Sequence, residues 1–229
     1  MTGVIDEVRA AAVFGPDQPE RFLTAWLGPP ARDVQHRVPD GLPVALVDWH
    51  RQVARWDSPV MRQNEVPSQR TMDGDVLLVG VENQGVWLWG VRDDGDNPMV
   101  WERENDPGAD WTETGERLDE FLWHFTLVEA VFGTQLGLGA ANVTPVDHDR
   151  LTRAWTALEV KPWRWPGPNA TLWTQGGLIA WTMVNDRPGA PVTDDSYYSL
   201  FVGARSNDDL APVDDADIRW DWDSRDEVQ

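Results

Sequence analysis

Two short apolar runs separated by a glycine-containing tetrapeptide constrain this chain more than any other feature. Residues 76–81 and 86–91 are rich in valine, leucine and tryptophan, and Glu-Asn-Gln-Gly at 82–85 separates them. Gly85 can adopt the positive φ that a tight hairpin turn requires. The pattern therefore predicts an antiparallel β-hairpin, so the fold must contain a sheet.

Further strands are predicted on both sides of the chain's midpoint. Residues 99–103 follow an acidic turn at 93–98, and together with the first hairpin they form a meander. Residues 171–175 and 178–184 flank Gly176-Gly177, which predicts a second hairpin, and 197–205 alternates like another strand.

Helical periodicity occupies the segments between these strands. One helix begins at Pro43 and continues to Pro59, and 116–132 carries a continuous apolar stripe. The glycine-rich segment 137–141 is interpreted as a flexible connection because it follows a helix and lacks the third glycine of a dinucleotide fingerprint. The remaining expected helices cover 4–13, 20–27, 147–158 and 208–216.

These elements predict an α+β class, with a mainly antiparallel mixed sheet flanked by helices. The strands fall into two groups, each followed by a helix, without the βαβ alternation of a parallel sheet. Residues 1–41 are expected to form an N-terminal helical extension. Residues 42–229 are expected to form a single α+β domain.

Composition excludes several classes of protein. The 229 residues include no cysteine, so disulfides and thiolate chemistry are excluded. Acidic residues stand near the N-terminus where a secretory signal would carry basic ones, and no apolar run approaches the roughly 18 residues that span a bilayer. We expect a cytoplasmic protein without membrane contact. One lysine against 18 arginines suggests a GC-rich bacterial genome.

The net charge of −20 argues against nucleic acid as a partner. Residues 93–120 hold 11 acidic and 2 basic side chains, and residues 194–229 hold 11 and 3. A field of this sign favours a basic protein partner, such as a toxin domain that cleaves nucleic acid, because carboxylates can mimic phosphates in its groove. The alternative is a solvated acidic surface that serves only solubility. The acidic candidates for partner binding are Asp93, Asp94, Asp96, Glu102, Glu104, Asp106 and Asp110.

Fifteen tryptophans form the second unusual feature. Trp87 and Trp89 lie between apolar neighbours and are predicted to be core residues. Trp163 and Trp165 lie among prolines in an irregular segment, where partial exposure would make them aromatic contacts for a partner. Exposed tryptophans also leave open a glycan-binding module.

No catalytic or metal-binding motif is recognised. The four histidines lack the spacing of a metal site, and His124 beside an apolar helical stripe is typical of a hydrogen-bonded, partly buried histidine. We therefore expect no catalytic residue, no metal and no cofactor. An uncharacterised enzyme remains a third hypothesis, because catalytic carboxylates that converge in space cannot be paired by sequence.

The order of signals from residue 42 to 132 resembles the SUKH superfamily, which is best known from bacterial immunity proteins. The resemblance lies in the Leu42-Pro43 helix start, the hairpin at 81–87 and the acidic turn at 96–100. It continues in Trp111, Phe121-Leu122 and the segment 202–205. The acidic turn departs from the family's usual Asp-Pro-Pro-Val, and the first 40 residues match nothing in the family.

The resemblance implies a compact α+β domain without a cofactor. Family members are often encoded beside a polymorphic toxin, which they neutralise by tight binding, and some relatives are interaction scaffolds. For this chain the resemblance implies an immunity protein that inhibits by covering a toxin's active site or a neighbouring surface.

Overall fold

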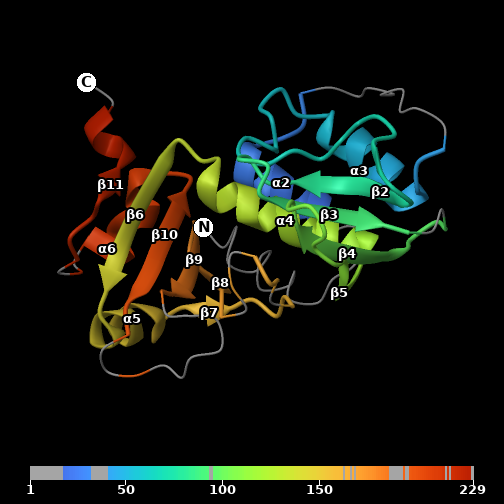
Figure 1. Ribbon diagram of the computed structural model, residues 1–229. Coiled ribbons are helices and arrows are strands. Elements are labelled where there is room, and N and C mark those ends of the chain that lie inside the picture. The colour runs from blue at the N-terminus through green and yellow to red at the C-terminus, as the bar shows by residue number, and fades with distance from the viewer. Residues whose placement is uncertain are drawn as a thin grey trace. The chain divides into compact units, whose positions relative to one another are not determined.

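Two antiparallel sheets and several helices make up the computed structural model of this chain, which confirms the α+β class (Figure 1). The described residues are 18–31, 41–92, 95–161, 163–165, 167, 169–185, 193, 196–214, 216 and 218–227. The chain divides into two compact units, one formed by Met1–Trp26 with Ala130–Gln229 and the other by Leu27–Glu129. The division after residue 41 stays a prediction, as does a helix at 4–13, which lies outside the described residues.

The unit Leu27–Glu129 contains a five-stranded sheet in the order β1-β2-β3-β4-β5. The predicted hairpin is confirmed as β2 and β3, and Gly85 in its turn has φ of 70°. β4 confirms the predicted third strand of the meander. The strand bounds are β1 Met72–Asp73, β2 Val76–Val81, β3 Trp87–Val91, β4 Met99–Glu104 and β5 Thr112–Arg117.

Helix α4, Leu118–Phe132, lies along one face of this sheet (Figure 1). The rings of Phe121 and Phe125 contact the Trp89 ring, with centroids 5.9 and 5.2 Å away. Every residue of β3 is buried, which confirms Trp87 and Trp89 as core residues. Burial of three aromatic rings in one cluster supplies much of the apolar area that stabilises this unit.

Three elements of this unit differ from the sequence-based expectation, and the first is β1, a two-residue strand that was not predicted. Helix α3, Val44–Val53, ends about one turn before Trp56 and is therefore shorter than the predicted helix. Trp56 lies beyond the helix, and its indole Nε1 donates to the carbonyl of Gly28 at 2.9 Å. β5 was not expected, because its residues are mostly polar and the strand lies at the edge of the sheet. An edge strand with one solvated face lacks the apolar signal from which strands are predicted.

The other unit contains a six-stranded sheet in the order β11-β6-β10-β9-β8-β7. The second predicted hairpin is confirmed as β8 and β9, and the predicted strand near 197–205 is confirmed as β10. The strand bounds are β6 Leu136–Val143, β7 Thr156–Ala157, β8 Thr171–Gln175, β9 Leu178–Val184, β10 Tyr198–Ala204 and β11 Trp222–Asp223.

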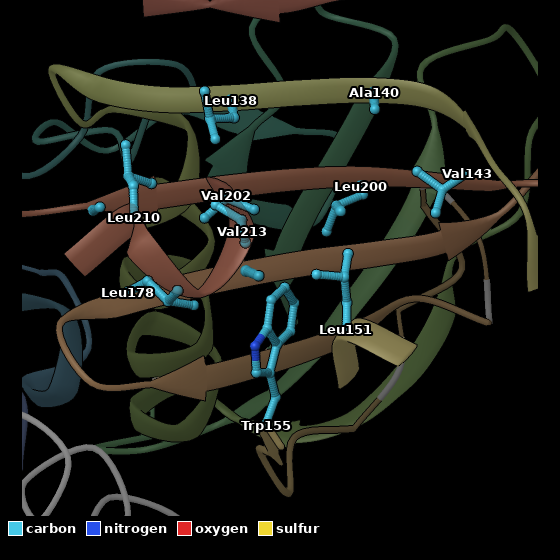
Figure 2. Close-up of a cluster of buried hydrophobic side chains, with 12 residues drawn as sticks. Leu138, Ala140, Val143, Leu151, Trp155, Leu178, Leu200, Val202, Leu210 and Val213 are labelled. Carbon is cyan, nitrogen blue, oxygen red and sulfur yellow. The ribbon is translucent and has the colours of Figure 1, made fainter. Parts of the chain in front are cut away.

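A cluster of buried apolar side chains stabilises this second sheet. Figure 2 shows Leu138 of β6 and Val202 of β10 on the same side as Leu210 and Val213, with Trp155 beneath them. Leu210 and Val213 come from the 3-10 helix η1, Asn207–Leu210, and the helix α6, Ala211–Asp214. These two short helices replace the single helix predicted at 208–216.

Helices α2 and α5 and the 3-10 helix η2, Ser224–Glu227, complete the described elements. α2, Gln18–Leu27, confirms the helix predicted at 20–27 and buries Phe22 and Leu23. α5, Pro145–Thr152, is shorter than predicted, because the chain turns at 153–154 and enters β7. Its N-cap Thr144 accepts a hydrogen bond from the backbone N–H of Asp147, which satisfies one free donor of the first turn. Among the described residues, no helix combines the length and apolarity needed to cross a membrane.

The prediction that 137–141 is a flexible connection is wrong, because these residues lie inside β6. The side of β6 at Gly137 is covered by the Trp222 ring, and a Cβ at Gly137 would come within 2.6 Å of that ring. The glycine therefore provides space for an aromatic ring that comes from a distant part of the chain. A local sequence pattern cannot reveal such a requirement.

The C-terminal segment pairs with β6 through side chains as well as backbone. The N–H of Ala141 donates to the Asp221 carboxylate at 2.7 Å, and the N–H of Gly137 donates to Ser224 Oγ at 2.8 Å. Arg225 binds the carboxylates of Asp223 and Asp214 at 2.6 and 2.7 Å, and its hydrogen bonds hold the pKa of Asp223 below its usual range. These contacts fix the position of Trp222 over Gly137.

We expect Gly137→Ala to destabilise the protein by roughly 1–3 kcal/mol, because the added methyl group overlaps the Trp222 ring. In the Trp222→Ala background the same substitution should cost little, since the overlapping ring is gone. Urea unfolding of the four proteins in this double-mutant cycle measures the coupling. Equal costs in both backgrounds would contradict the proposed contact.

Candidate binding surface

The loop between β4 and β5, residues 105–111, is the centre of the candidate surface. Its first residue is fixed to the β2–β3 turn, because the Asn105 N–H donates to the carbonyl of Val86 at 2.8 Å and its side-chain amide donates to that of Gly85 at 2.7 Å. The β4–β5 loop then makes a turn of its own, in which the carbonyl of Asp106 accepts from the Ala109 N–H at 3.1 Å. The loop therefore has a defined conformation at its β4 end.

Arg103, on β4, connects this loop to the β1–β2 turn. Its guanidinium donates to the Asp73 carboxylate through Nη2 at 2.6 Å and through Nε at 3.1 Å. Nη1 donates to the backbone carbonyls of Glu104 and Asp106 at 2.8 and 3.2 Å. The guanidinium also lies over the Trp111 ring, 5.2 Å from its centroid. Arg103 is thus bound on several sides by one carboxylate, two carbonyls and one ring.

A shallow cavity of about 440 Å³ opens beside Arg103. Its walls are the β1–β2 turn at 73–75, the loop at 105–109, and Trp111. Three aspartates, Asp73, Asp75 and Asp106, contribute to these walls. Asp73 is neutralised by Arg103, while Asp75 and Asp106 are exposed and make no ion pair with any described residue.

Four of the predicted acidic candidates lie on the surface. Asp96, Glu104, Asp106 and Asp110 are exposed, and Asp106 is also part of the cavity. Asp93 and Asp94 lie outside the described residues. The sequence-based prediction missed Asp73 and Asp75, although an acidic pair around Gly74 in a turn is a visible signal.

Glu102 is a correction to the predicted acidic surface. Its side chain is 2% exposed, and it accepts a hydrogen bond from Trp87 Nε1 at 3.2 Å. Because side chains alternate along a strand, Glu102 shares the inward face of β4 with Val100. Strand alternation therefore determines the burial of Glu102, and its carboxylate cannot contact a partner on the surface.

Other glutamates of this unit are buried as well. Glu82 accepts from the backbone N–H of Gln84 at 2.8 Å inside the hairpin turn, and Glu116 lies 3.0 Å from His124 Nδ1. His124 is buried and hydrogen-bonded, as predicted. Part of the negative charge of this unit therefore stabilises the fold and is not available for binding.

Glu129 on α4 accepts several hydrogen bonds from one segment of the chain. Its side chain is 1% exposed, and its two oxygens accept from the backbone N–H groups of residues 62, 63 and 64 at 2.7–3.0 Å. The Asn64 side chain adds a fourth hydrogen bond at 2.7 Å. Hydrogen bonds to a buried charge are stronger than neutral ones, and each donor would be costly to leave unpaired.

The aromatic candidates require a second correction. Trp163 is only 4% exposed, so it does not form an accessible contact, whereas Trp165 is half-buried. An irregular backbone does not keep an indole out of the interior, since its burial is strongly favourable. Of all the tryptophans, each of which the structure describes, only Trp222 counts as exposed, at 38%.

A histidine cluster in the other unit has the order of a proton relay. Asp149 Oδ1 lies 3.4 Å from His148 Nδ1, and His148 Nε2 lies 3.4 Å from Thr182 Oγ1. The threonine is 2% exposed and already accepts a hydrogen bond from Trp173 Nε1 at 2.8 Å. A substrate cannot reach a hydroxyl buried to this extent, so the cluster provides no accessible nucleophile.

Metal binding finds no support in the described part of the chain, where no three His, Asp or Glu side chains converge in a way that could hold an ion.

The chain matches no family model, no curated protein and no solved structure.

The contribution of the buried Glu129 carboxylate to stability can be tested by substitution. Glu129→Gln keeps the side chain's size but turns an amide NH₂ toward backbone N–H donors, so we expect a loss of about 1–3 kcal/mol in the free energy of unfolding. Glu113→Gln, on the exposed face of β5, is the matched control and should change stability by less than about 0.5 kcal/mol. Chemical denaturation compares the two, and equal effects would contradict the role assigned to Glu129.

Another prediction concerns His148. Burial lowers its pKa below 6.5, against the opposing effect of Asp149. The folded state therefore favours the neutral ring, and its stability falls as the pH drops below about 6.5 and through the folded pKa. The His148 ring stacks on the Tyr198 ring with a centroid distance of 3.8 Å. His148→Phe keeps an aromatic ring in this place and removes the titratable group.

The measurement for His148 is urea unfolding at pH 7.5 and pH 5. The wild type should lose more stability between the two pH values than His148→Phe does. An identical loss in both proteins, or a pKa above 6.5 for His148 by NMR titration, would show that the assignment is wrong.

Proposed function

We propose that this chain is a non-enzymatic immunity protein that neutralises a cognate bacterial toxin by binding it through an acidic surface. A single observation carries the proposal. Asp96, Glu104, Asp106, Asp110 and Glu113 are all exposed in one unit, and none of the five forms an ion pair with a described residue. Unpaired like charges destabilise a fold by mutual repulsion, and a basic partner relieves that repulsion.

The charge distribution determines what such a surface contributes to binding. Exposed carboxylates steer a basic partner during diffusion and reject acidic ones, so they mainly raise the association rate. A toxin that cleaves nucleic acid has a basic groove for phosphates, which makes a nuclease the partner class that fits best. Inhibition then consists of covering the groove.

The sequence resemblance to the SUKH superfamily also supports this proposal, and most of the residues that carry it are apolar or turn residues. The α+β class agrees with it, although a fold class is shared by many functions. An interaction scaffold of the same family would use the same surface for a partner that is not toxic, and the two hypotheses differ only in that partner.

Glycan recognition through tryptophans is not favoured. A stacking platform needs exposed rings, but Trp87, Trp89 and Trp163 are buried. Trp222 is exposed, but part of its ring packs against Gly137, and a single ring of this kind does not form a platform.

Co-expression with the product of the neighbouring gene tests the proposed function. We expect that the chain restores growth of cells that express this product and that the two proteins co-purify. Absence of both rescue and complex would overturn the pairing. A complex that forms although the partner alone does not inhibit growth would favour the scaffold hypothesis.

The association rate tests the role of the acidic surface. Glu104→Gln combined with Asp110→Asn should slow association about tenfold at low salt and much less at high salt, because screening already weakens steering there. Glu159→Gln with Asp208→Asn removes the same charge from exposed positions in the other unit. If this control pair slows association as much, the surface assignment is wrong.

A further inference from the structure

The cavity beside Arg103 offers a more specific contact than the open acidic surface around it. It lies entirely within one unit, between the β1–β2 turn and the loop at 105–109, with Trp111 as an aromatic wall. Its volume of about 440 Å³ falls in the range of about 300–1,000 Å³ that small-ligand sites occupy. A shallow hollow of this volume can receive the end of one long side chain.

The charge of the cavity selects the sign of its occupant. Of its charged walls, Arg103 is positive and Asp73, Asp75 and Asp106 are negative. The Arg103 guanidinium already donates to the Asp73 carboxylate and to two backbone carbonyls, so few of its N–H donors can bind an incoming anion. An anion would also meet the carboxylates of Asp75 and Asp106. A cation is therefore the favoured occupant.

The free carboxylates and the ring further narrow the kind of cation. Asp75 and Asp106 stand on different walls, and a guanidinium presents five donors in a planar fork that can bind two carboxylates. The methylene stem of such a side chain can pack along Trp111 and Pro107. Arg103 shows that a guanidinium is already accommodated by these surroundings, through Asp73, backbone carbonyls and Trp111.

We propose that this cavity receives an arginine side chain of the basic partner, held by Asp75 and Asp106 against Trp111. The inference rests on the proposed function, because it supplies the anchor of the same interface. The exposed carboxylates outside the cavity mainly set the encounter rate, and the arginine bound in the cavity mainly sets the lifetime of the complex.

A blocked tripeptide, acetyl-Gly-Arg-Gly-amide, tests the cavity without any partner. Added to the full-length protein, it should shift the NMR signals of residues 73–75 and 105–111 and of the Trp111 indole, with a dissociation constant on the order of 1 mM. The citrulline analogue has the same shape without the charge and should shift none of them. Absence of shifts with the arginine peptide, or equal shifts with citrulline, would overturn the inference.

Asp75→Asn with Asp106→Asn should abolish these shifts, while Asp208→Asn in the other unit should leave them unchanged. Both cavity residues are exposed, so the double variant should fold normally. Shifts that persist in the double variant would place the peptide elsewhere and refute the proposed site.

The complex with the co-expressed partner separates this inference from the proposed function. The cavity variant should raise the dissociation rate at least about tenfold, whereas Glu104→Gln with Asp110→Asn, which removes the same charge outside the cavity, should leave the dissociation rate nearly unchanged. If the complex forms and its dissociation rate is unaffected, the arginine site is wrong while the proposed function stands. If no complex forms, the proposed function fails, and the peptide titration still decides on the cavity.

Discussion

The structure of the Leu27–Glu129 unit depends most on the hydrogen bonds that the buried Glu129 carboxylate accepts. A long polar connection without regular structure leads from α3 to the first strand, and backbone donors in such a segment must be satisfied. One buried side chain on α4 accepts three of these N–H groups and an amide, and so attaches the connection to the helix that covers the sheet. These hydrogen bonds offset the cost of burying the charge and hold residues 62–64 against α4.

Buried glutamates change how the acidity of this chain should be understood. A net charge computed over a segment treats every carboxylate as exposed, yet Glu102 and Glu116 lie in the interior of the same segment that holds Asp106 and Asp110. The two groups differ in their partners, because the buried carboxylates accept hydrogen bonds from indole or imidazole nitrogens while the exposed ones have no ion pair with described residues. The fold and the proposed binding surface thus use the same residue type for different purposes.

The sequence predicted the hairpins well and the glycine-rich strand badly, for one physical reason. Gly85 and Gly176 act through their own backbone, and a positive φ beside two apolar runs is a local signal. Gly137 acts through the space it leaves for Trp222, 85 residues away, which no local pattern contains. The same limit applies to the candidate surface. Strand alternation could have excluded Glu102 from the predicted surface in advance. That Asp75 and Asp106 line the same cavity became visible only in the folded sheet.

The pairing of β11 with β6 also determines what a cut before Asp221 would do. Without that segment, the backbone groups of β6 that now meet Asp221 and Ser224 would lose their partners, and the glycine face under the ring would be bare. An uncovered strand edge with little side-chain bulk is a template on which other chains can add strands. The C-terminal residues therefore protect this sheet against aggregation as well as completing it.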